Sequence, residues 1–191
     1  MQNLLKKAAT LDIQMICPLH GPIWRENLPY FIQKHDLWSR YEPESRSVLI
    51  VYGSPYGHTE SAATALANML AQKGVKDIRM FDVSGTPVSY LVSEAFRCSH
   101  IVLAAPTYNG GLFPPMESFM LDLQAHFLQG RTFAILENGT WAPQAAKAIQ
   151  AIMAEMKPNT LLEPIVSIKS SLKSEQLPAL QQLADAIVAS L

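Results

Sequence analysis

From residue 47 to the end of the chain, short apolar segments rich in strand-forming residues alternate with segments whose apolar residues recur at helical spacing. This strand-then-helix unit occurs five times in about 145 residues. The expected strands are 47–53, 76–83, 100–105, 132–136 and 161–168, and the expected helices are 59–73, 88–97, 116–128, 142–156 and 175–191. Such alternation predicts an α/β domain in which helices cover both faces of a parallel sheet.

The first 46 residues do not continue this alternation. They are expected to contain a helix end, one strand, an aromatic-rich helix and a polar linker, at 4–10, 12–17, 28–41 and 42–47. So short a segment cannot close a hydrophobic core of its own. We therefore divide the chain into residues 1–46 and 47–191, and interpret the first part as the tail of another domain or as an arm packed on the main domain or on a partner.

The composition restricts the classes of partner. Apolar residues make up 49% of the chain and the net charge is −1, which describes a globular protein without a basic surface for nucleic acid or anionic membranes. The longest apolar runs fall far short of the roughly 18 residues that a membrane span needs, and the N-terminus lacks the pattern of a signal peptide. We expect neither a nucleic-acid nor a membrane partner.

The two cysteines, Cys17 and Cys98, lie far apart in the sequence. They form neither a disulfide framework nor a C-x-x-C pair. We expect both to pack as small apolar residues in a reducing, cytoplasmic protein.

The first expected strand leads directly into a loop of small and hydroxyl-bearing residues, after which a helix begins. The loop residues are Ser54, Pro55, Tyr56, Gly57, His58 and Thr59. A helix N-terminus offers free N–H groups and a partial positive charge to an anion. Because the loop is neither G-x-G-x-x-G nor a Walker A sequence, it favours one terminal phosphate without a metal ion. The alternative is an ordinary turn capped by Thr59. For His58 two roles stay open, donation to the phosphate or exposure to water.

Two further loops follow the third and fourth expected strands, and each combines an aromatic residue with Asn-Gly. The candidate ligand-binding residues are Pro106, Thr107, Tyr108, Asn109, Gly110 and Gly111 in one loop, and Asn138, Gly139, Thr140 and Trp141 in the other. The carboxyl ends of parallel strands share one edge of the sheet, so we expect all three loops to meet there. Tyr108 and Trp141 are candidates for stacking on a flat ligand. Each loop taken alone is also typical of an ordinary turn, and we expect the neighbouring Glu137 to point to solvent.

The three loops resemble the phosphate loop and the two isoalloxazine loops of flavodoxin-like FMN domains. In the phosphate-loop pattern Ser/Thr-x-Thr-Gly-x-Thr, the residues Ser54, Gly57 and Thr59 match, and Tyr56 replaces the central Thr. The resemblance implies FMN as cofactor and a doubly wound, five-stranded parallel sheet of order 2-1-3-4-5 with a short N-terminal appendage. It also implies that a peptide at Gly110 or Gly111 can turn toward the flavin.

The N-terminal part of the chain indicates a more specific resemblance, to one family of proteins that contain such a domain. The segments 11–13 and 17–25 are similar to the last stretch of the metallo-β-lactamase-like domain of flavodiiron proteins, also called A-type flavoproteins. This implies that residues 1–46 are the remnant of that domain with its linker. It further implies that residues 47–191 form an FMN domain that passes electrons from a rubredoxin-like or other donor to a diiron centre that reduces O₂ or NO. The family forms head-to-tail homodimers.

In flavodiiron proteins the residue that matches His20 is an iron ligand. This chain holds none of the companion ligands, and one imidazole cannot hold two irons, so we expect no metal site in it. No catalytic constellation stands out either. We expect His35, His100 and His126 to lie at the surface or at element ends.

Two other functions remain open. An FMN-dependent NAD(P)H:quinone reductase would be reduced rapidly by NAD(P)H, although no second nucleotide loop is visible. A flavin-free interaction module would dock through the aromatic helix 28–41 and would have no affinity for FMN.

Overall fold

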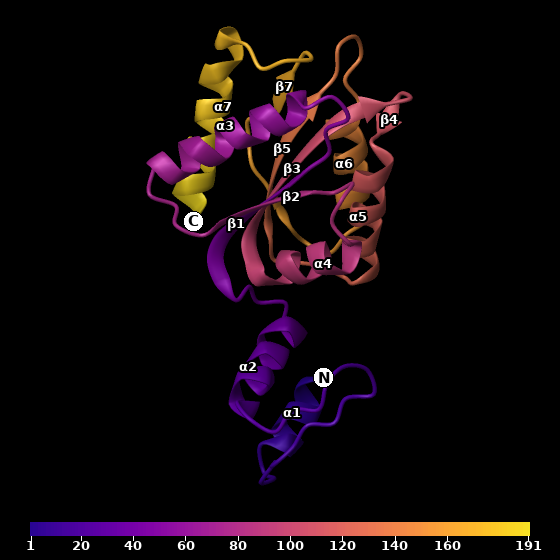
Figure 1. The fold of residues 1–191 in the computed structure, drawn as a ribbon, viewed down its shortest axis with the longest axis vertical. Helices are drawn as coiled ribbons and strands as arrows, with labels where there is room; N and C mark the ends of the chain where they lie inside the picture. The colour runs from indigo at the N-terminus through magenta and orange to yellow at the C-terminus, as the bar shows by residue number, and fades with distance from the viewer.

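A computed structural model describes all 191 residues and shows one central sheet between two layers of helices (Figure 1). The sheet has the strand order β2-β1-β3-β5-β6, and all of these pairings are parallel. The strands of this path are β1 (Ser45–Tyr52), β2 (Ile78–Asp82), β3 (Cys98–Tyr108), β5 (Thr132–Asn138) and β6 (Thr160–Leu161). The predicted flavodoxin-like α/β fold is confirmed.

The fifth predicted strand is divided in two. The segment 161–168 forms β6 and, further along, β7 (Val166–Ile168), and both pair with β5. Pro164 lies between them and has no N–H group to donate to a strand ladder. Apolar character alone did not reveal this interruption.

Each face of the sheet has its own hydrophobic core. On one face pack α3 (His58–Gln72) and α7 (Leu177–Ser190), and on the other α4 (Val88–Arg97), α5 (Pro114–Ala125) and α6 (Ala145–Ala154). Strand β1 shows why its sequence does not alternate with polar residues. Leu49 and Val51 belong to one core, Val48 and Ile50 to the other, and all four are fully buried. Burying each such side chain contributes roughly 1.5–3 kcal/mol.

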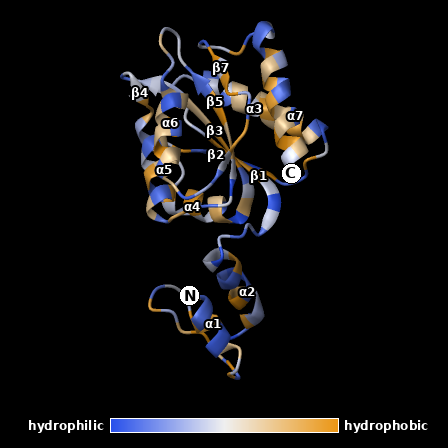
Figure 2. Cartoon of the chain, turned by 180° about the vertical axis from the view of Figure 1, so that it is seen from behind, coloured by the Kyte–Doolittle hydropathy of each residue, from blue (hydrophilic) through white to orange (hydrophobic).

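The N-terminal arm, residues 1–44, projects from the end of the domain where β1 begins (Figure 1). It contains α1 (Gln2–Ala8) and α2 (Leu28–Ser39), and Leu28 is its only buried residue. The strand expected at 12–17 is absent, because the segment has no partner strand beyond one bridge between Ile16 and Trp24. Figure 2 shows polar and apolar residues mixed along the arm.

Hydrogen bonds attach the arm to the domain. The guanidinium of Arg131, 1% exposed, donates to the carbonyl oxygens of Tyr41 at 2.6 Å, Phe96 at 2.8 Å and Ala95 at 3.1 Å. Burial lowers the pKa of Arg131 to about 10. The side chain therefore ties the end of the arm to the C-terminal end of α4.

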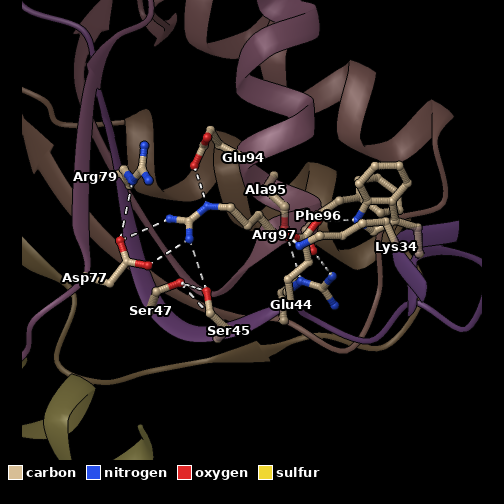
Figure 3. Close-up of polar contacts among 12 residues, drawn as sticks. Lys34, Glu44, Ser45, Ser47, Asp77, Arg79, Glu94, Ala95, Phe96 and Arg97 are labelled. Atoms are coloured by element: carbon tan, nitrogen blue, oxygen red, sulfur yellow. Dashed lines mark hydrogen bonds and ion pairs between the residues drawn. The ribbon is translucent and has the colours of Figure 1, made fainter. Parts of the chain in front are cut away.

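A second arginine stabilises the start of β1. Arg97 donates to Asp77 at 2.7 Å, Glu94 at 2.9 Å and Ser45 at 3.2 Å (Figure 3). The hydrogen bonds that Arg97 donates to Asp77 hold the pKa of the Asp77 carboxyl below its usual range.

Of the side chains of Cys17, Cys98 and His100, two differ from expectation in their burial. Cys98 is buried, as predicted, but Cys17 is exposed because it lies in the arm, which has no core to receive it. His100 is buried rather than superficial, since its ring lies between Ser99 and Ser190 near the C-terminal end of α7. No helix in this fold combines the length and the apolar character needed to cross a membrane.

Candidate functional site

A cavity of about 460 Å³ lies at the carboxyl edge of the sheet, and the three predicted loops meet in it. All the predicted site residues line it except Gly57 and Gly111. The predicted lining residues are Ser54, Pro55, Tyr56, His58, Thr59, Pro106, Thr107, Tyr108, Asn109, Gly110, Asn138, Gly139, Thr140 and Trp141. The volume is in the range typical of small-molecule and cofactor sites.

The first loop leaves amide groups free at the start of α3. Gly57 precedes the helix with φ of +81°, a conformation that favours glycine. The Ser54 hydroxyl accepts a hydrogen bond from the Glu60 N–H at 3.1 Å, whereas the N–H groups of residues 56–59 donate to no acceptor in the protein. Unpaired N–H groups at a helix N-terminus are suited to an anion.

The second loop is shorter than expected, because β3 continues to Tyr108 and turns back as a hairpin into β4 (Gly111–Leu112). Asn109 and Gly110 form the two-residue turn, with φ of +49° and +76°. Positive φ at both positions is the mark of a type I′ turn, which Asn-Gly strongly favours. The hairpin places Tyr108 at the cavity wall, where the residue is about half exposed.

The third loop begins later than expected, since β5 extends through Glu137 to Asn138. Asn138 donates to the Thr59 hydroxyl at 3.2 Å and to the Ser170 carbonyl at 2.9 Å. The Thr59 oxygen accepts from Asn138, so its own proton is free to be donated into the cavity. Asn138 thereby links the third loop to the first.

The prediction that Glu137 points to solvent is wrong. The residue is 8% exposed, and its Oε2 atom accepts a hydrogen bond from the Ala146 N–H at 2.9 Å. Thr107 accepts from the N–H groups of Gln144 and Ala145 at 2.8 and 3.2 Å. Three N–H groups at the start of α6 therefore donate to side chains from β3 and β5.

The chemistry of the lining is that of a site for a flat ligand with one phosphate. The lining contains no Lys, Arg, Asp or Glu, so a phosphate would depend on the free amides and hydroxyls at α3. At the rim, the side chains of Tyr56 and Trp141 are 88% and 95% exposed and are available to contact a planar ring. These residues fit FMN, because its phosphate needs hydrogen-bond donors and its isoalloxazine ring needs flat aromatic contacts.

Two lining residues were not predicted, Ala142 and Ser170. Ser170 follows β7 and has φ of +65°. A signal for it was available in the sequence, because the fifth predicted strand also ends at this edge. The split of that strand obscured it.

The charged neighbours of the site lie outside the lining. The Tyr52 hydroxyl donates to Glu60 at 3.2 Å, and burial, followed by the carboxylate of Glu60, raises the pKa of Tyr52. His20 lies exposed in the arm. No group of three or more His, Cys, Asp or Glu residues is arranged to hold a metal ion.

Comparison with known proteins agrees with this geometry. Residues 50–181 match the flavodoxin family. An uncharacterized protein of Methanocaldococcus jannaschii is 26% identical over 175 residues, which are 92% of this chain and 44% of the relative. The anaerobic nitric oxide reductase flavorubredoxin of Vibrio vulnificus is 24% identical over 151 residues, which are 76% of this chain and 29% of the relative. The chain thus spans less than half the length of these relatives.

Solved structures have the same fold. The rubredoxin oxygen:oxidoreductase of Desulfovibrio gigas superposes with a TM-score of 0.82 at 19% identity, covering 99% of this chain and 47% of that one. A flavodoxin from the domain Archaea superposes with a TM-score of 0.65 at 25% identity, covering 75% of this chain and 97% of that one. The likeness to a flavodoxin covers that protein almost entirely. The family match over residues 50–181, together with the three loops that meet at the edge of the sheet, shows that this chain belongs to the flavodoxin family, whose cofactor is FMN.

Proposed function

We propose that the chain binds FMN in the edge cavity and serves as the electron-transfer domain of a flavodiiron-type O₂/NO reductase. The proposal rests on one observation: a single cavity has both free amide groups, those of residues 56–59, and exposed aromatic rings at its rim. When bound, FMN supplies the redox chemistry, and the protein supplies orientation and electrostatics.

The residues have separate tasks in this proposal. The amides of 56–59 and the Thr59 hydroxyl bind the phosphate, and the absence of lysine and arginine from the lining makes them its main support. Tyr108 and Trp141 cover the ring, and the Asn109–Gly110 turn presents its peptide groups to the ring edge.

The N-terminal arm is proposed to be the end of a metallo-β-lactamase-like domain, joined to β1 by the polar linker that begins at residue 42. The arm buries a single residue, and its exposed apolar side chains, Leu19 among them, are suited to packing on a larger body. The likeness to the Desulfovibrio gigas structure, which extends over 99% of this chain, includes the arm. The diiron centre would lie in that larger body, outside this chain.

The position of the arm also bears on assembly. It leaves the domain at the amino end of β1, whereas the loops that line the cavity lie at the carboxyl edge of the sheet, at the opposite end of the domain (Figure 1). A body attached to the arm would therefore be distant from the cavity of its own chain. We propose a head-to-tail homodimer in the cytoplasm, which brings the cavity of one subunit near the metal domain of the other, with a rubredoxin-like protein as donor.

Titration of the purified protein with FMN, followed by absorbance and by quenching of flavin fluorescence, tests the cofactor. We expect one FMN per chain. A protein that stays colourless and does not quench FMN would contradict the proposal and favour the interaction module.

Anaerobic stopped-flow mixing then tests the electron donor. We expect the FMN-loaded protein to be reduced faster by reduced rubredoxin than by NADH. Rapid direct reduction by NADH would favour the NAD(P)H:quinone reductase instead.

A further inference from the structure

Two consecutive polar residues end strand β5 and point to opposite faces of the sheet. Successive side chains of a strand alternate between its faces. Ile135 belongs to the core beneath α6 and Leu136 to the core beneath α3. Accordingly Glu137 reaches α6 and Asn138 reaches Thr59 at the start of α3, and each is 8% exposed.

Glu137 has no place in the cavity lining, so it does not act by touching a ligand. Its carboxylate accepts the Ala146 N–H at 2.9 Å, next to the two N–H groups that Thr107 accepts. A carboxylate at a helix N-terminus is favourable both as a hydrogen-bond acceptor and through the helix dipole. The carboxylate therefore fixes where α6 begins relative to β5.

The segment 139–143 connects these two elements and carries Trp141. Trp141 is 95% exposed and so has almost no packing of its own to hold it. Its position depends on the two ends of the segment. One end is held by the hydrogen bonds of Asn138 to Thr59 and Ser170, and the other by the cap that Thr107 and Glu137 provide.

We propose that Glu137 is a positioning residue for the flavin ring, an inference that rests on the proposed FMN site. By capping α6 it holds segment 139–143 so that Trp141 faces the ring. It has no part in binding the phosphate, which lies at α3. The proposal separates two groups of residues, one that sets the affinity for the ring and one that sets the affinity for the phosphate.

The test compares the dissociation constants of FMN and riboflavin for the full chain and three variants. Glu137→Ala removes the cap, Glu137→Gln keeps a carbonyl acceptor, and Glu155→Ala is a control at an exposed glutamate just after α6. We expect Glu137→Ala to weaken the binding of both ligands by the same factor, about threefold to fivefold, because a loss that acts through Trp141 stays within the loss of the Trp141 ring contact itself. Glu137→Gln should restore both constants to within about twofold, because an oxygen acceptor remains, and Glu155→Ala should match the unchanged protein.

Other outcomes identify which statement fails. A purely structural role would reduce the fraction of molecules that bind without changing the dissociation constant of the rest, and this would overturn the positioning role. Unchanged constants in Glu137→Ala, or a loss confined to FMN, would also overturn it. If the unchanged protein itself binds no FMN, the proposed function fails with it. Amide hydrogen exchange in the ligand-free protein tests the cap independently. We expect the first turn of α6 to exchange faster in Glu137→Ala. Unaltered exchange would contradict the cap.

Discussion

Two helices begin at the cavity, and their first turns are satisfied in different ways. At α3, only the Glu60 N–H has a side-chain acceptor, and the N–H groups of residues 56–59 are free. At α6, the N–H groups of Gln144, Ala145 and Ala146 are all taken by Thr107 and Glu137. The protein thus supplies its own oxygen acceptors to one helix and leaves the other for an anion. The α3 end of the cavity is therefore suited to an anion, and the α6 end is not.

Of the changes that test this difference between the two helices, removal of the phosphate from the ligand should have the largest effect on binding affinity. A phosphate that receives several hydrogen bonds at α3 gains about 1.5–3 kcal/mol from each, so riboflavin should bind on the order of a thousandfold more weakly than FMN. Fluorescence titration of both ligands measures the ratio. Equal affinities would mean that the open helix end takes no part in binding.

Thr59→Val should produce the next largest effect. The change removes the hydroxyl that accepts from Asn138 and that can donate to the phosphate. We expect FMN binding to weaken about tenfold to a hundredfold, as for a hydrogen bond to a charged group, with a much smaller change for riboflavin. Thr86→Val, at a partly exposed threonine before α4, is the control. An equal loss for both ligands would place Thr59 at the ring instead.

Trp141→Ala tests the other end of the cavity. Loss of an aromatic contact worth about 0.5–1.5 kcal/mol should weaken FMN and riboflavin equally, by about threefold to tenfold. Trp38→Phe, in the arm, should leave both affinities unchanged. A loss seen only with FMN would contradict the assignment of Trp141 to the ring.

The smallest effect is expected at the amino edge, away from both helix ends. Burial and the nearby Arg46 lower the pKa of His100, so the folded state favours the neutral ring. The unfolded chain therefore takes up a proton first, and the stability that this residue contributes is complete above about pH 6.5 and is lost as the pH falls below it. Urea unfolding between pH 7 and pH 5 should show a steeper loss for the unchanged protein than for His100→Gln. Parallel curves would show that His100 does not couple stability to pH.

Much of the candidate site could be predicted from residue types at the ends of strands. Apolar runs without alternation indicated buried parallel strands, and the loops after three of them carried glycine, hydroxyl and aromatic residues. The Asn109–Gly110 pair also carried the signal for a two-residue hairpin, although the segment was interpreted as an open loop. The burial of His100 and the exposure of Cys17 could not be predicted in this way, because both depend on what packs against them.

The sequence by itself determined the alternation of strand and helix, the two covered faces and the three loops at one edge, because these follow from local periodicity and from the parallel connection of strand to helix. The order of the strands in the sheet came from the resemblance to flavodoxin-like domains. Only the tertiary structure decided which helix end stays open. Thr59 and Asn138 lie 79 residues apart in the sequence, and Thr107 and Gln144 lie 37 apart. Local periodicity carries no information about contacts over such separations. In the folded protein, the side chains of β5 alternate between the faces of the sheet, so Glu137 contacts α6 and Asn138 contacts α3.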